Sequence, residues 1–327
     1  MILLSSETLD PFFNLAAEEY LLKNVQEELF FLYRNTPCVI VGKHQNALAE
    51  VNIAYLLQHG IPVIRRISGG GAVYHDEGNV NYSFHLNAGD TSNLNFRKFK
   101  EPVVYALKQL GLNPEFSTRN DILLSGLKIS GSAEHVSHKR VISHGTLLYN
   151  ANLEHLSQTL RVKEGLYAGK AVKSVKSKVS NISSFLDQMK TNEGFFEALL
   201  GAIQSFFPDS ERMVLSGDEK AKIRVLAEEK YKTWEWNFGY SPDYKVSRDI
   251  NVRGCGQVKI DFAVSRGVIK SLEATLMHDL TDDMKFPDFS QLNGQHHRFE
   301  NIRDFFVNEK NRLSGLWDVE ASALSLM

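Results

Sequence analysis

Residues 65–76 read Arg-Arg-Ile-Ser-Gly-Gly-Gly-Ala-Val-Tyr-His-Asp, so two arginines stand just before three consecutive glycines. Arginine presents a planar fork that matches carboxylate or phosphate oxygens. Glycine has no Cβ, so the backbone N–H groups of such a run can approach an anion closely. The stretch therefore predicts a site for a charged small molecule such as one that carries phosphate. A plain β-hairpin with a flexible turn and surface arginines is the alternative.

A second informative stretch lies downstream, where residues 119–121 read Arg-Asn-Asp and residues 126–133 read Gly-Leu-Lys-Ile-Ser-Gly-Ser-Ala. Lys128 falls in a β-like run, and the small residues after it leave room beside its side chain. A lysine held in this way is a point charge that can stabilise developing negative charge. A hairpin lysine that points to water is the alternative.

Two common nucleotide motifs are excluded for the glycine run. It lacks the Gly-x-x-x-x-Gly-Lys-Ser/Thr of a P-loop, and no Gly-x-Gly-x-x-Gly opens a helix here. Several histidines raise the question of a metal site, namely His75, His85, His135, His138 and His144. The spacing of His135 and His138 is a weak ligand pattern, and no cysteine or acidic pattern accompanies it. A structural zinc site is therefore disfavoured.

Composition is that of an ordinary globular protein. The chain has 327 residues, which is enough for one large domain and a smaller one. The net charge of −2 argues against a broad nucleic-acid or anionic-membrane surface. The two cysteines, Cys38 and Cys255, imply no disulfide framework. The apolar start at residues 1–4 is too short for a signal or membrane segment. We expect a monomeric cytoplasmic protein with no nucleic-acid or membrane partner.

The pattern of elements predicts a sheet-centred α+β domain and not the regular alternation of a doubly wound fold. Strands are expected at residues 2–5, 28–33, 37–42, 80–86 (half-buried), 121–129 and 145–150, and on both sides of the glycine run. Helices are expected at residues 13–23 after an Asp10 N-cap, 51–58 before Gly60, 96–110, 193–206 and 218–230.

A turn-rich stretch at residues 237–242 is the candidate linker. Strands are expected after it at residues 244–248, 258–264 and 268–276, and helices at 288–292 and 299–308. We therefore expect a domain at residues 1–242 and a small α+β accessory domain at residues 247–327.

Taken together, these stretches resemble the lipoate–protein ligase A family in its longer form. The matching blocks occur in family order, at residues 13–16 with Glu18, 65–76, 78–79, 81–84, 119–121, 128–133, 144–148, 174–179 and 234–239. The resemblance implies a large catalytic domain of the biotin/lipoate ligase type with an accessory domain after it.

The resemblance also implies the activity. Such a ligase uses ATP, with Mg²⁺, to convert lipoate to lipoyl-AMP, and then transfers the lipoyl group to a lysine of a carrier domain. The glycine-cleavage H protein and the dehydrogenase E2 subunits are the implied carriers. Both steps build negative charge near the carboxyl–phosphate junction, so a preorganised cation there is valuable.

Site roles follow from the same resemblance. Lys128 is the expected catalytic cation. The residues expected to bind ATP and the adenylate are Arg66, Gly71, Ala72, Val73, Tyr74 and Lys128. Those expected to bind lipoate are Arg66, Lys128, Leu15, Val73 and Tyr82. Supporting roles are expected for His75, Asn79, Asp121, Ser130, Gly131, His144 and Gly145. Asp121 could orient Lys128, hold Mg²⁺ or receive the incoming amine, and these three roles stay open.

There are three alternatives to this function. Octanoyl- and lipoyl-transferases of this fold carry the acyl group on a cysteine, which needs an accessible thiol with a depressed pKa. Neither Cys38 nor Cys255 falls in the segment from Lys128 to Thr146, which weakens that alternative. A non-catalytic binder of lipoyl or biotinyl groups would not need Lys128. A biotin ligase is disfavoured because the matching blocks are those of lipoate ligases.

Overall fold

The computed structural model describes residues 1–87, 97–160, 165–186, 191–252, 256–277, 286–313 and 318–327. The chain forms two compact units, each with its own apolar core. The first comprises Met1–Lys43, Ile61–Ser157 and Ser174–Thr233, and the second comprises His44–Gly60, Gln158–Lys173 and Trp234–Met327. In the part of the chain that is described, no helix is both long and apolar enough to cross a membrane.

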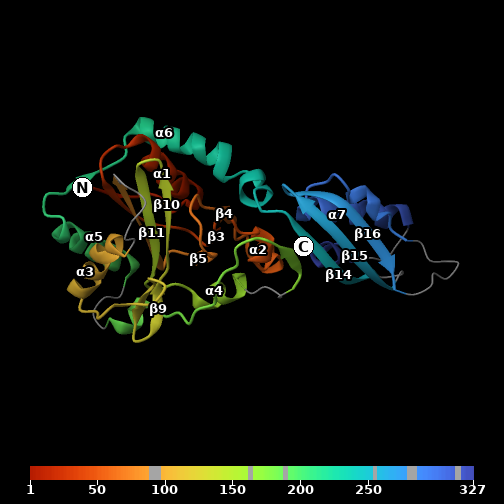
Figure 1. Ribbon diagram of the computed structural model, residues 1–327, viewed down its shortest axis with the longest axis horizontal. Coiled ribbons are helices and arrows are strands. Elements are labelled where there is room, and N and C mark those ends of the chain that lie inside the picture. The colour runs from red at the N-terminus through yellow and green to blue at the C-terminus, as the bar shows by residue number, and fades with distance from the viewer. Residues whose placement is uncertain (88–96, 161–164, 187–190, 253–255, 278–285, 314–317) are drawn as a thin grey trace. The chain divides into compact units, whose positions relative to one another are not determined.

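A six-stranded sheet forms the centre of the first unit (Figure 1). Its strands are β1 (Ile2–Ser5), β2 (Leu29–Arg34), β6 (Asn79–Asn87), β10 (Ser132–Ser137), β11 (Arg140–Leu148) and β13 (Glu211–Met213). The strand order is β10-β11-β6-β2-β1-β13. β1 pairs in parallel with β2 and β13, whereas the other neighbours are antiparallel. The strand β10 was not expected from the sequence, and β11 begins earlier than expected.

Helices cover both faces of this sheet. α1 (Pro11–Asn24) contacts β2, β6 and β11, and α6 (Gly217–Leu226) packs against α1. α3 (Glu101–Gln109) and α5 (Asn192–Phe206) contribute to the apolar core on the opposite face (Figure 1). Because both faces are covered, residues 79–85 of β6 are all buried, and the expectation of a half-buried strand is wrong.

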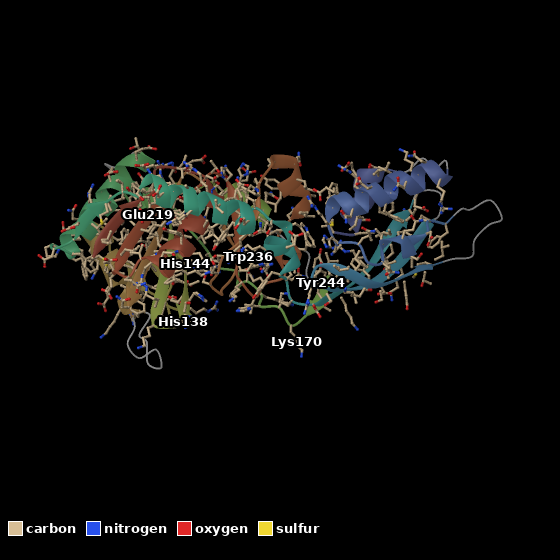
Figure 2. All side chains as sticks on the ribbon, turned by 90° about the horizontal axis from the view of Figure 1, so that it is seen from above. His138, His144, Lys170, Glu219, Trp236 and Tyr244 are labelled. Carbon is tan, nitrogen blue, oxygen red and sulfur yellow. The ribbon has the colours of Figure 1, made fainter. Side chains whose placement is uncertain are left out.

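Helix starts follow the capping rules. The Asp10 side chain accepts a hydrogen bond of 2.9 Å from the backbone N–H of Phe12, with proline at the first helical position, as expected. Ser216 and Glu219 (labelled in Figure 2) form a capping box at the start of α6. The helix expected at residues 96–110 begins only at Glu101, after a 3₁₀ turn at Lys98–Lys100, and residue 96 lies outside the described residues.

The strands on either side of the glycine run do not form a hairpin. β4 (Val63–Arg65) and β5 (Val73–His75) both pair with β3 (Cys38–Val41), which lies between them. β4 is parallel and β5 antiparallel to β3. The alternative of a plain hairpin turn is therefore wrong, because the glycine run has to cross over the end of β3.

A small antiparallel sheet carries the second sequence stretch. Its strands are β7 (Glu115–Phe116), β8 (Ile122–Leu124) and β9 (Leu127–Ser130). The single strand expected at residues 121–129 is instead a hairpin, since Ser125 and Gly126 turn the chain with φ of 50° and 77°. The turn places Lys128 on the strand that returns.

The second unit is a four-stranded antiparallel sheet with helices. Its order is β12 (Tyr167–Gly169), β14 (Tyr244–Val252), β15 (Gly256–Ser265) and β16 (Val268–Leu276). The inward side chains of β14 and β15 form an apolar core with α7 (Phe299–Leu313) and α8 (Val319–Ser325). The unit also contains α2 (Ile53–His59), which ends at Gly60 with φ 62°, as expected. The three strands expected after residue 242 are confirmed, whereas β12 and α8 were not expected. Residues 235–239 form a helical turn.

Gly42 allows the crossover of the glycine run. A Cβ atom at Gly42 would lie 2.1 Å from the carbonyl oxygen of Gly70. Gly42→Ala should therefore lower the free energy of unfolding by about 1–3 kcal/mol, the usual cost of overpacking. Gly201→Ala is the matched control, because Gly201 lies in α5 with open space around its Cβ position. It should be neutral or more stable by up to about 1 kcal/mol. Urea unfolding compares the two variants, and equal stability would show that the crossover tolerates a side chain.

Candidate active site

The buried guanidinium of Arg66 organises the glycine loop, which we define as residues 66–72. Arg66 is only 6% exposed. Its donors bind acceptors from β3 and the loop itself, namely Ile40 O at 3.3 Å, Ser68 Oγ at 2.9 Å, Gly69 O at 3.1 Å and Gly71 O at 2.8 Å. Burial lowers the pKa of Arg66 to about 10, so the group stays charged at neutral pH. The loop carbonyls thus replace water around a buried cation.

A chain of buried polar groups continues from Arg66 into the sheet. Ser68 Oγ lies 2.6 Å from His144 Nε2, and His144 Nδ1 lies 2.7 Å from Glu18 Oε2. The other oxygen of Glu18 accepts a hydrogen bond of 3.0 Å from the Tyr33 hydroxyl. The Glu18 carboxylate accepts a hydrogen bond from Nδ1 of His144, so the imidazole ring joins Ser68 of the glycine loop to α1. Figure 2 shows His144 among the strands of the first unit.

Lys128 is held by a carboxylate and by the backbone around it. Its Nζ atom lies 3.0 Å from Asp121 Oδ1, with the two side chains 25% and 19% exposed. A Cβ atom at Gly131 would lie 3.1 Å from Nζ, so the glycine leaves the space that the ammonium group occupies. The alternative of a lysine that points freely into water is wrong.

The segment at residues 174–180 runs from the glycine loop to Lys128. At one end the Ser174 hydroxyl accepts a hydrogen bond of 2.8 Å from the backbone N–H of Ala72. At the other end, Lys128 N donates to Lys178 O at 2.9 Å and Ser180 N donates to Lys128 O at 3.1 Å. The two sequence stretches are therefore bridged by one segment within the first unit, which pairs with β9 through an isolated bridge between Val179 and Lys128.

Leu15 and Tyr82, both expected to bind lipoate, lie in different elements. Leu15 is buried in α1, on the same helix as Glu18. Tyr82, by contrast, belongs to the core cluster of α3 and α5, and Gly145 packs against its hydroxyl. Leu15 is not a member of that cluster.

Other expected residues lie on β5, β6 and β9, where Val73 is half-buried and Tyr74, Asn79 and Ser130 are buried. Val73 and Tyr74 lie in β5, and Tyr74 stacks on His155 with 6.3 Å between ring centroids. Asn79 donates a hydrogen bond of 2.7 Å to Asn81, and Ser130 is buried at the end of β9.

The sequence indicated no site role for Glu18, Ser68, Tyr33 or Ser174. The sequence did carry one indication for Glu18, because Asn14 and Glu18 are four residues apart and the residues between them are apolar. Two polar residues at that spacing share one face of a helix and indicate a buried polar contact. Ser174 carried no such signal, since its partner is a backbone N–H far away in the sequence.

The histidines do not form a metal site in the described residues, where no group of three or more His, Cys, Asp or Glu side chains is placed to hold an ion. His135 lies in β10 and His138 in the turn after it (Figure 2). His75 accepts a hydrogen bond of 3.1 Å at Nδ1 from the Asn35 amide. Burial, with the nearby charges of Arg66 and His144, lowers the pKa of His75 to about 3.

Comparisons with known proteins identify the family of this chain. Residues 10–204 match the family described as the lipoyl protein ligase A/B catalytic domain. The chain is 43% identical over 263 residues to lipoate–protein ligase 1 of Staphylococcus aureus, covering 80% of each chain. It is also similar to a lipoate–protein ligase A solved with bound ATP (TM-score 0.63, 28% identity, 73% of this chain and 98% of that one).

A further solved structure is that of a bipartite lipoate–protein ligase studied with its E2 lipoyl domain, from Thermoplasma acidophilum. It has a TM-score of 0.64 and 28% identity, and covers 73% of this chain and 96% of that one. The fold and the comparisons define an enzyme of the ligase class. The chain belongs to the lipoate–protein ligase family.

The buried histidines make the first unit sensitive to acid. Burial lowers the pKa of both His75 and His85 to about 3, below the 6.5 of an unfolded chain. Below pH 6.5 the unfolded state therefore binds more protons than the folded state, and stability falls as the pH falls toward 3. Each histidine should contribute about 1.4 kcal/mol per pH unit well below pH 6.5. The free energy of unfolding, measured by urea unfolding with circular dichroism between pH 6.5 and 4.5, should fall less steeply with falling pH in His75→Gln. The difference in slope should be about 1.4 kcal/mol per pH unit. An unchanged slope would mean that His75 is protonated in the folded protein.

Proposed function

We propose that this ligase activates lipoate with ATP and then acylates a carrier lysine. Attack of the lipoate carboxylate on the α-phosphate of ATP forms lipoyl-AMP and releases pyrophosphate. The ε-amine of the carrier lysine then attacks the acyl carbon, forms the amide, and expels AMP. The observation that carries this proposal is the glycine loop bridged to the Lys128–Asp121 pair by residues 174–180.

The chemistry explains why such a site needs fixed cations. A carboxylate is a poor acyl donor because oxide is a very poor leaving group, whereas AMP leaves readily. Negative charge grows at the carboxyl–phosphate junction in both steps. A cation that is already in place stabilises that charge without reorganisation. Lys128 is placed on a strand and held by Asp121, so we assign it this role.

Arg66 and the backbone of Gly71, Ala72, Val73 and Tyr74 are proposed to border the nucleotide. In this structure Arg66 fixes the loop conformation through the loop carbonyls. Its part in binding ATP and lipoate would then act through the shape of the loop as well as through its charge. Leu15, near Glu18 in α1, is proposed to face the uncharged dithiolane tail.

Mg²⁺ is proposed to accompany ATP. This ion commonly uses one or two carboxylates together with substrate phosphates. Asp121 is a half-buried carboxylate beside Lys128, so it fits as one such ligand. When bound, the ion would neutralise phosphate charge.

The acceptor is proposed to be a lipoyl carrier domain of the glycine-cleavage H protein or of a dehydrogenase E2 subunit. The support is the bipartite ligase of T. acidophilum, which was studied with its E2 lipoyl domain. We further propose that residues 1–242 carry the catalytic site and that residues 247–327 form an accessory domain.

The cysteine-dependent alternative finds no support at Cys38. That thiol is fully buried in β3, and burial raises its pKa well above the usual range. A buried neutral thiol is a poor nucleophile. Cys255 lies outside the described residues.

One assay tests the function directly. The protein is incubated with ATP, Mg²⁺ and lipoate, with and without purified carrier domains, and the products are analysed by mass spectrometry. Lipoyl-AMP should form without a carrier, and the carrier should then gain the mass of one lipoyl group. An acyl adduct on a cysteine, with no adenylate, would instead establish a transferase.

Lys128→Ala should slow formation of lipoyl-AMP by about 10²–10³-fold, the usual cost of losing one preorganised charge-stabilising group. The fold should survive, because the Lys128 side chain is a quarter exposed and not part of the apolar core. Lys139→Ala, in the exposed turn between β10 and β11, is the control and should keep normal activity. Pyrophosphate release measures the rate. Near-normal rates in Lys128→Ala would remove Lys128 from the mechanism.

A further inference from the structure

Lys100 is a buried lysine that contacts the turn before β8, the first strand of the hairpin that carries Lys128. It lies at the N-cap position of α3, and its side chain is only 3% exposed. A lysine ammonium group is costly to bury unless it is paired and hydrogen-bonded. The groups that pair with it are therefore held firmly in place, because moving them would leave the charge uncompensated.

The partners of Lys100 come from the turn before β8 and from β10. Its Nζ atom donates a hydrogen bond of 3.2 Å to the backbone carbonyl of Asn120. It also lies 3.4 Å from Oε1 of Glu134 on β10, with the carboxylate side chain 21% exposed. One ammonium group thus ties the turn before β8 to the edge strand of the main sheet.

The turn that Lys100 binds ends at Asp121. Asn120 has a φ of 61°, the left-handed conformation that non-glycine residues rarely adopt. Ser117 closes the turn, since its Oγ accepts from Asp121 N at 3.0 Å and its carbonyl accepts from Asn120 N at 3.1 Å. The next atoms along the chain are those of the Asp121 carboxylate, which holds Lys128 Nζ at 3.0 Å.

We propose that Lys100 is a positioning residue for the Lys128–Asp121 pair. Its ammonium group fixes the carbonyl of Asn120, and so the direction in which Asp121 presents its carboxylate to Lys128. This role rests on the ligase function proposed above. Lys100 does not touch the substrates; it acts through the turn at residues 117–121.

The kinetic test uses Lys100→Met, which keeps the length of the stem and removes the charge. The rate of lipoyl-AMP formation at saturating ATP and lipoate should fall about tenfold to hundredfold, the scale for a catalytic group that is misplaced by about 1 Å. The KM values for ATP and lipoate should change less than about twofold, because Arg66 and the glycine loop, which are proposed to bind the substrates, do not depend on Lys100. Lys220→Met on α6 is the control. It breaks an exposed ion pair with Glu7 and should keep the wild-type rate. An unchanged rate in Lys100→Met would overturn the proposal.

A double-mutant cycle separates positioning from a general effect on the fold. In the Lys128→Ala background, Lys100→Met should cost no further rate, because the group that it positions is gone. Val103→Ala, a cavity variant in the core of α3, gives a loss of stability without touching the turn. Additive losses in the cycle, or a matching loss of rate in Val103→Ala, would show that Lys100 matters only for stability.

A readout independent of activity keeps this proposal distinct from the proposed function. Amide hydrogen exchange in a peptide covering residues 117–124 should be faster in Lys100→Met and unchanged in Lys220→Met. Glu134→Gln keeps the shape of the partner and removes its charge, so it should give a smaller increase in the exchange rate. This variant provides the test if Lys100→Met does not fold. Faster exchange in an enzyme that forms no lipoyl-AMP would refute the ligase chemistry and leave the positioning intact. Unchanged exchange in both Lys100→Met and Glu134→Gln would refute the proposal that Lys100 positions the turn.

Discussion

The burial of the Arg66 guanidinium is the constraint on which the site depends. A cation away from water needs acceptors on every side, and the chain supplies them from its own loop and from β3. Because those acceptors are carbonyls of Gly69 and Gly71, the loop has to fold back over the arginine. Ser68 then links the same guanidinium to His144 and through it to α1. The conformation of the loop is thereby fixed by the sheet and the first helix together.

The rest of the site is held to this loop through the backbone. Residues 174–180 bind Ala72 at one end and pair with Lys128 at the other, so one segment connects the loop to the lysine. Lys128 is fixed in turn by Asp121, and the turn before Asp121 is closed by Ser117. A ligase that forms a reactive adenylate gains from such an arrangement, because its charged groups need no reorganisation when the charge develops.

Helix ends could be predicted from neighbouring residues. The hairpin, the burial of β6 and several site contacts depend on the folded chain. Asp10 and Gly60 marked the ends of helices because capping depends on neighbouring residues only. The prediction of one strand at residues 121–129 was wrong because Ser125 has a positive φ, which a serine does not indicate in a sequence. The burial of β6 on both faces follows from α1 on one face and from α3 and α5 on the other, and alternation alone cannot indicate it. In the site, the motifs indicated Arg66, Lys128 and Asp121, whereas Ser174 required the folded chain, since nothing local links it to the loop.

The structure of the protein with bound lipoyl-AMP would test this account most directly. The account predicts that Lys128 Nζ lies within hydrogen-bond distance, about 3 Å, of oxygens at the carboxyl–phosphate junction. It also predicts that the backbone of residues 71–74 borders the nucleotide, with Arg66 still beneath the loop. An adenylate bound away from the glycine loop, or with its phosphate out of reach of Lys128, would contradict it.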